Sequence, residues 1–220
     1  MSTVSDRRHE DDREVERAAV ERLMLFTDAV VAIAITLLVL PLVDLAREDG
    51  SIGDLWRDNR GQFVAFGVSF LVIAKLWAAH HSRMRSISRC PGQLVWCDML
   101  WLATIVFLPF TTELLGGPRG DETSTRVMYV GSVLACTLAF DLLEWVASQL
   151  RDDDGPDRAV FVEGWVPSVL TAIALVVVAV APALGLWPMA LLMLSGPVTG
   201  LAQRWVLRRR GSQPDPDPGS

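Results

Sequence analysis

The sequence predicts an all-helical, multi-pass membrane protein with six transmembrane helices and no soluble domain. Two observations support this: 51% of the 220 residues are apolar, and the charges are unevenly distributed. Residues 62–77 contain one charge, Lys75, and residues 164–203 contain none. A soluble domain of this size does not need six long apolar blocks. About 20 apolar residues cross the bilayer as a helix, because lipid offers no partner for unpaired backbone groups.

The predicted spans follow one another with short loops. They cover residues 22–43, 62–80, 94–112, 127–150, 164–184 and 187–207. Residues 1–18 are expected to form a charged cytoplasmic arm, residues 19–208 the membrane domain, and residues 209–220 a disordered tail. The first residues lack the short apolar core of a signal peptide.

Basic residues predict the orientation of the chain, since they are enriched in cytoplasmic loops. Thirteen arginines lie in the two terminal segments and in the second and fourth loops, against five in the first and third loops. Both termini are therefore expected in the cytoplasm, and the chain in the cell membrane.

This orientation places the ionisable residues of the spans towards the cytoplasmic side. They are Arg22, Asp28, His80, Asp98, Asp141 and Glu144. The outer half of the first span contains one polar residue, Thr36. We therefore expect a polar inner belt and a dry outer layer. An ionisable group inside a membrane is a functional candidate, but structural pairing is the favoured role for Asp28.

Several other classes of protein are not supported. The three cysteines form no CxxC pair, so we expect free thiols and no metal site. Motifs of hydrolases, metalloproteases and nucleotide-binding enzymes are absent from the sequence, so we expect neither enzymatic activity nor a cofactor. Basic stretches with interleaved aromatic residues are also absent, so nucleic acid is not an expected partner.

The first span carries a recognisable motif, Arg22-x-x-x-Phe26-Thr27-Asp28, followed by AVVAIAITLLVLP. With Trp77-x-x-His80 in the second span, it closely resembles the transmembrane-protein-175 family of potassium channels. That family has Ser where this chain has Thr27. The single six-helix unit resembles the prokaryotic members. The resemblance implies a potassium-selective or potassium-preferring channel with a pore lined by the first helix. It also implies a homotetramer, since the motif occurs once in this chain.

The residues of the pore can be considered from helix geometry. Ile33, Leu37 and Leu40 are spaced so that they lie within about 60° of one another on a helix. The resemblance implies that such residues form the apolar constriction, with the Thr36 hydroxyl beside them. Asp28 lies about 140° from Ile33 and should point into the bundle.

The resemblance also implies contacts between helices for the motif residues Arg22, Phe26, Thr27, Asp28, Trp77 and His80. The residues themselves suggest a hydrogen-bonded network in which Arg22 donates, Asp28 accepts and His80 takes part.

Two other functions stay open at this stage. The alternative is an ion- or proton-coupled secondary transporter, with Asp28, Lys75, Asp98 and Asp141 as a relay. A structural membrane scaffold is the other. The first four spans lack glycine or proline breaks at mid-depth, which disfavours a transporter.

Overall fold

The computed structural model describes residues 4–47, 51–87, 89–150 and 158–180, with side chains described from residue 11 and, in the last segment, for residues 168–179. Within these residues the chain forms seven helices and no strand. They are α1 (Val4–Leu37), α2 (Leu40–Leu45), α3 (Ile52–Asp58), α4 (Arg60–Met84), α5 (Gly92–Gly116), α6 (Thr123–Ser148) and α7 (Arg158–Val180).

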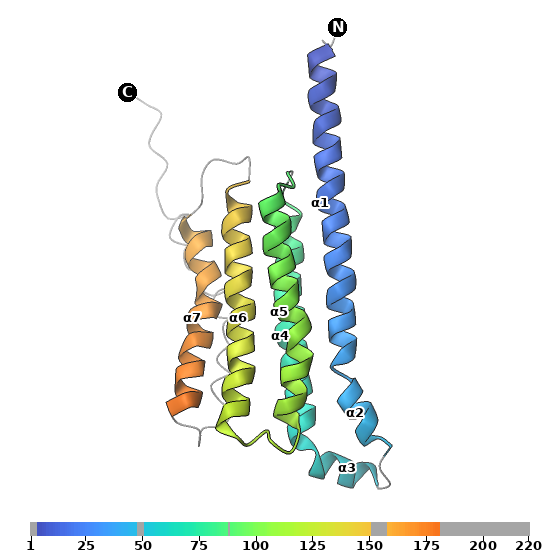
Figure 1. Ribbon diagram of the computed structural model, residues 1–220, viewed down its shortest axis with the longest axis vertical. Coiled ribbons are helices and arrows are strands. Elements are labelled where there is room, and N and C mark those ends of the chain that lie inside the picture. Colours follow the sequence, from blue (N-terminus) through green and yellow to red (C-terminus); the bar gives the residue numbers. More distant parts are fainter. Residues whose placement is uncertain (1–3, 48–50, 88, 151–157, 181–220) are drawn as a thin grey trace, which may run out of the picture.

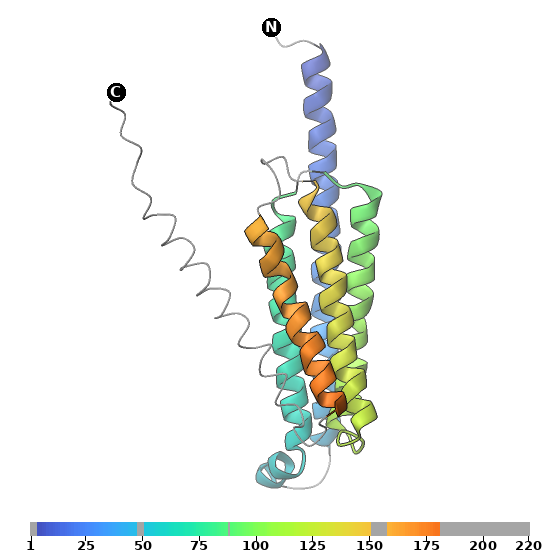
Figure 2. The same ribbon diagram turned by 90° about the vertical axis from the view of Figure 1, so that its left-hand side faces the viewer.

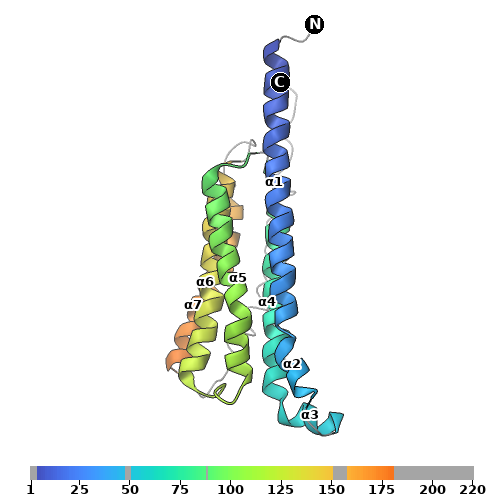
Figure 3. The same ribbon diagram turned by 45° about the vertical axis from the view of Figure 1, so that its right-hand side comes forward.

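The five long helices run side by side as a bundle, and α2 and α3 lie at one end of it (Figure 1). At the opposite end, which we call the arm end, α1 extends beyond the other helices (Figure 1). Figure 3 shows α1 and α4 on one side of the bundle and α5 to α7 on the other. Helix α5 packs against α1, α4 and α6, and α7 packs against α6. Figure 2 is viewed from the α7 side and shows α7 in front and α1 behind the other helices.

Four segments of the described chain are long and apolar enough to cross a membrane: Asp11–Leu45, Arg60–Met84, Gly92–Gly116 and Thr123–Ser148. They contain the first four expected spans, apart from the last two residues of the fourth. The fifth expected span overlaps α7, in which the apolar stretch Ser168–Ala179 is shorter. The sixth, residues 187–207, and the tail over residues 209–220 lie outside the described residues. The described part of the chain is therefore all-helical, and its long apolar helices are those of a multi-pass membrane protein.

The first expected span is not one uninterrupted helix. Helix α1 continues from the charged arm without a break at residue 18 and ends at Leu37; α2 begins at Leu40. Pro41 accounts for the interruption, because it has no backbone N–H to bond to the Leu37 carbonyl four residues earlier and its ring clashes with that carbonyl. The sequence analysis placed Leu40 on the same helix as Ile33 and Leu37, and this is wrong: Leu40 belongs to α2.

The core of the bundle lies where α4, α5 and α6 meet. Ile73, Trp101, Ile105, Tyr129 and Val133 are fully buried there. Because lipid tails are as apolar as these side chains, close packing and buried hydrogen bonds hold membrane helices together. The three cysteines are free, as expected.

Candidate functional site

Helix α1 presents two different faces. Thr27, Val31 and Ala34 are at most 1% exposed and face α4 and α5. Ile33 and Leu37, on the opposite side, are 59% and 40% exposed. An apolar row therefore lies open along α1, on the face expected from the sequence.

The remaining members of the expected constriction are arranged less simply. Leu40 is 52% exposed but belongs to α2. The Thr36 hydroxyl donates a hydrogen bond to the Ile33 carbonyl at 2.8 Å. Phe26 is 51% exposed, and Arg22 is exposed on the same helix.

A buried network joins three helices near the arm end. The Asp98 carboxylate on α5 accepts a hydrogen bond from Thr27 Oγ1 on α1 at 2.6 Å. Its other oxygen lies 2.7 Å from His80 Nε2 on α4. Thr27, His80 and Asp98 are each at most 1% exposed. The His80 ring stacks on Trp101 with 4.5 Å between ring centroids and 6° between ring planes. Asp98 thereby fixes α1 and α4 to α5.

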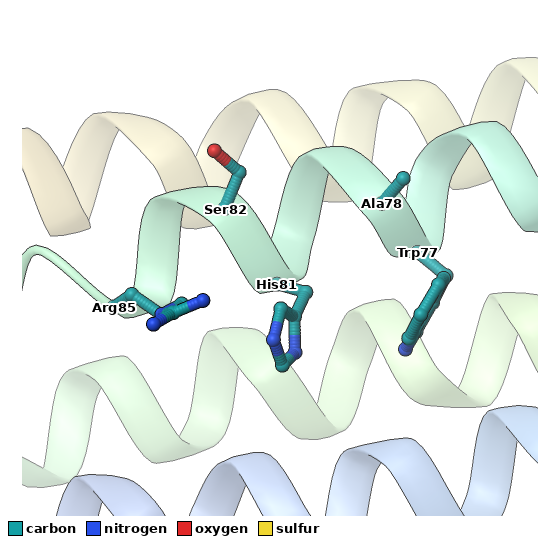
Figure 4. A pocket seen from close by; sticks show the side chains of 5 residues that line it. All are labelled: Trp77, Ala78, His81, Ser82 and Arg85. Atoms are coloured by element: carbon teal, nitrogen blue, oxygen red, sulfur yellow. The ribbon is translucent and has the colours of Figure 1, made fainter.

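A second network lies beside the first and is partly open. The Trp77 indole N–H on α4 donates to Asp28 Oδ1 on α1 at 2.8 Å. His81 Nδ1 lies 3.7 Å from Asp28 Oδ2, beyond hydrogen-bond distance. The Asp28 side chain is 33% exposed and that of His81 37%. Trp77 and His81 project from the same side of α4 (Figure 4).

The expected network of Arg22, Asp28 and His80 is therefore wrong in its pairing: His80 binds Asp98, and Asp28 binds Trp77. Consecutive residues on a helix point about 100° apart, so Thr27 and Asp28 face different neighbours. The sequence analysis named Asp98 but missed its partners and the stacking of Trp101. The sequence offered one signal for this network, namely that Asp98 is a charged residue near the start of an apolar span.

The half of the bundle nearer α2 and α3 is not dry. Thr112 Oγ1 donates to Ser69 Oγ at 2.7 Å, and Ser69 Oγ lies 2.9 Å from the Tyr129 hydroxyl. Thr111 Oγ1 lies 2.9 Å from Ser132 Oγ. All five residues are buried, so a hydroxyl cluster joins α4, α5 and α6. The expected dry layer holds along α1 but not in the bundle.

Ionic contacts also tie α6 to its neighbours at the arm end. Arg83 on α4 forms an ion pair with Glu144 on α6 and lies over the Phe140 ring, 5.9 Å from its centroid. The Ser168 hydroxyl on α7 donates to the Asp141 carboxylate. No group of three or more His, Cys, Asp or Glu residues in the described part of the chain could hold a metal ion.

Comparison with known proteins identifies the matched region. The family model described as "Endosomal/lysosomal potassium channel TMEM175" matches residues 22–109. A Streptomyces collinus protein named as a potassium channel is 33% identical over 130 residues, covering 56% of this chain and 62% of the relative. Residues 22–109 therefore resemble the TMEM175 family.

Two other proteins show how far the likeness extends. The Bos taurus protein named endosomal/lysosomal proton channel TMEM175 is 28% identical over 147 residues, which are 61% of this chain and 30% of that protein. The crystal structure of a TMEM175 homolog from Chamaesiphon minutus shares the fold, with a TM-score of 0.69 and 23% identity. It matches 83% of this chain and 99% of the solved one. The chain matches less than two thirds of the length of the first bacterial relatives.

The TMEM175 match contains both polar networks around α1. It begins at Arg22 and ends before Thr111 and Thr112, so Thr27, Asp28, Trp77, His80 and Asp98 all lie inside it. The hydroxyl cluster and the contacts of Glu144 extend beyond it. The family region is therefore the part that fixes α1 to the bundle.

Proposed function

We propose that this chain is the subunit of a potassium-selective channel in which four copies surround a pore lined by α1. The observation that carries the proposal is the exposure of Ile33 and Leu37 on a helix whose other face is fixed within the subunit. Relatives named as potassium channels, and a solved neighbour whose title describes a lysosomal potassium-selective channel TMEM175 homolog, support it.

In this proposal Ile33 forms the principal apolar ring, and Leu37 and Leu40 form rings beyond it. A ring of such side chains offers an ion no replacement for its water, so it controls passage by dewetting. Thr36 flanks the rings. The Thr27–Asp98–His80 network and the Asp28–Trp77 bond hold α1 in position behind them.

The proposal also includes the architecture around the pore. Six spans, both termini in the cytoplasm and a place in the cell membrane follow from the apolar runs and the arginine counts. Ser51 and Ser124, which are both exposed, then face the outside. A cysteine at either position, in a chain without Cys90, Cys97 and Cys136, should react with a membrane-impermeant reagent applied to intact cells. Protection of both cysteines from the reagent would indicate the opposite orientation, with both termini outside.

The function is tested by electrical recording from the purified protein in liposomes with opposed potassium and sodium gradients. A channel gives a current whose reversal potential follows the potassium gradient. Saturable uptake coupled to protons, without such a current, would instead identify a secondary transporter. The animal relatives are named as proton channels. A separate recording with a proton gradient alone therefore tests whether the protein conducts protons.

The pore face is tested by Ile33→Asn. The carboxamide eases the dehydration of ions, so we expect higher conductance and a reversal potential shifted towards that of a non-selective pore. Leu71→Asn on α4 is the matched control, because Leu71 is 50% exposed but lies outside the proposed pore. Val31 is 1% exposed, so an asparagine there would disturb packing. A change of selectivity in Leu71→Asn and none in Ile33→Asn would assign the pore to another helix.

A further inference from the structure

A shallow groove lies along the last turns of α4 at the arm end of the bundle. Its volume is about 420 Å³, and it is lined by Trp77, Ala78, His81, Ser82 and Arg85. Figure 4 shows Trp77 and His81 on one side of α4 and Ala78 and Ser82 on the other, with the Arg85 side chain extending towards His81. These rows follow from helix geometry, because residues four apart lie above one another.

The polar groups that line the groove suit an anion. Arg85 offers a guanidinium, Ser82 a hydroxyl and His81 an imidazole, and no carboxylate is among the lining residues. The nearest acid described beside it, Asp28, already accepts the hydrogen bond of Trp77 and lies 3.7 Å from His81 Nδ1. A guanidinium binds the oxygens of a phosphate through two parallel hydrogen bonds. The lining therefore matches a phosphate ester better than a cation or an apolar group.

The position of the groove indicates which kind of phosphate ester would bind there. The candidate span Arg60–Met84 ends beside Arg85, so the groove lies where an apolar span meets the headgroup layer. Tryptophan is enriched at this depth, and basic pockets there bind the head groups of anionic lipids. We propose that the groove binds the phosphate of an anionic phospholipid, with Arg85 and Ser82 as the principal donors and the Trp77 ring against the glycerol and upper chain. This rests on the membrane placement within the proposed function.

A lipid in this groove would touch the side chains that hold the proposed pore helix. Trp77 donates to Asp28, and His81 lies next to the same carboxylate on α1. The bound headgroup and the Asp28–Trp77 hydrogen bond thus share one side chain. Anionic lipid should therefore support conduction as well as bind.

The experiment is native mass spectrometry of the detergent-purified full chain, titrated with phosphatidylglycerol and, separately, with phosphatidylcholine. We expect adducts of phosphatidylglycerol at concentrations where phosphatidylcholine gives few. Arg85→Gln should weaken phosphatidylglycerol binding about fivefold, the change expected for one basic residue near anionic lipid. Arg85→Lys should restore part of it. Arg13→Gln, on the exposed arm of α1, removes the same charge and should leave binding unchanged.

Two further results distinguish other occupants. Inorganic phosphate in excess should not displace the lipid; displacement would indicate a site for a free anion and overturn the lipid assignment. A changed oligomer mass in Arg85→Gln, with unaltered lipid adducts, would show that a second copy of the chain covers the groove. Equal binding by Arg85→Gln and Arg13→Gln would also overturn the proposal. Because adducts are counted without any current, a protein that binds the lipid but does not conduct would refute the channel and not the groove.

Discussion

Within the bundle, the two halves of α1, residues 20–28 and residues 29–37, are held in different ways. Near the arm end, Thr27 and Asp28 make side-chain hydrogen bonds to α5 and α4. Farther along, Val31 and Ala34 are at most 1% exposed, and their side chains can make apolar contacts only. One half is thus fixed by directional bonds, and the other by packing.

This difference has consequences in a membrane. Lipid tails are as apolar as the side chains of the second half, so burying Val31 or Ala34 between helices yields no hydrophobic gain over facing lipid. Hydrogen bonds specify one rotation of the helix, whereas apolar packing tolerates several. We therefore expect the rotation of α1 to be determined by Thr27 and Asp28.

The strongest test of this comparison is Asp98→Ala. The substitution leaves His80 and the Thr27 hydroxyl buried without their shared acceptor, and each buried polar group left unpaired costs about 1–3 kcal/mol. We expect loss of the folded assembly, measured as the yield and thermal midpoint of the purified oligomer. Asp98→Asn keeps the shape of the side chain and one acceptor oxygen, so the yield and thermal midpoint of the oligomer should fall less. An Asp98→Ala oligomer as stable as the unsubstituted one would show that packing alone suffices in both halves.

A smaller effect is expected from Asp28→Ala. Asp28 is one third exposed and bonds to a neutral indole, so the loss should be about 1–2 kcal/mol. The thermal midpoint should fall less than in Asp98→Ala, while the assembly persists. Trp77→Phe removes the same hydrogen bond from the other side and serves as the matched variant. If Asp28→Ala lowered the thermal midpoint more than Asp98→Ala, the Asp28–Trp77 hydrogen bond would be the principal attachment of α1 to the bundle.

The smallest effect is expected in the apolar half, from Thr36→Val. The Thr36 hydroxyl is bonded to the Ile33 carbonyl of its own helix, and valine has nearly the same shape. Stability should change by less than about 0.5 kcal/mol, and single-channel conductance should stay the same. A clear fall in conductance, with Ser restoring it, would show that the hydroxyl faces the ions.

The sequence was sufficient for features that depend on one helix alone. The runs of about 20 apolar residues predict where four helices cross the membrane, and the 100° step per residue predicts that Ile33 and Val31 lie on opposite faces of their helix. The interruption after Leu37 was also visible, because Pro41 stands in the sequence. The predicted span ignored it because hydropathy does not register a lost backbone N–H.

Features that depend on two helices were not predictable from these patterns. Whether Asp28 or Asp98 meets His80 depends on how α1, α4 and α5 are rotated against one another, and spacing within each helix leaves this open. Ser69, Thr112 and Tyr129 carry no charge, so they did not stand out in apolar spans. Their convergence is a property of the packed bundle.

The neighbouring bonds of Thr27 and Asp28 also act mechanically, as a fulcrum. Because these two residues are tied to different helices about 100° apart, α1 cannot turn about its axis without breaking one of the bonds. A tilt about this point keeps both. Leu37 lies ten residues, or about 15 Å, along the helix from Thr27. A tilt of about 10° would therefore move Leu37 sideways by about 2.6 Å, whereas Thr27 itself would hardly move.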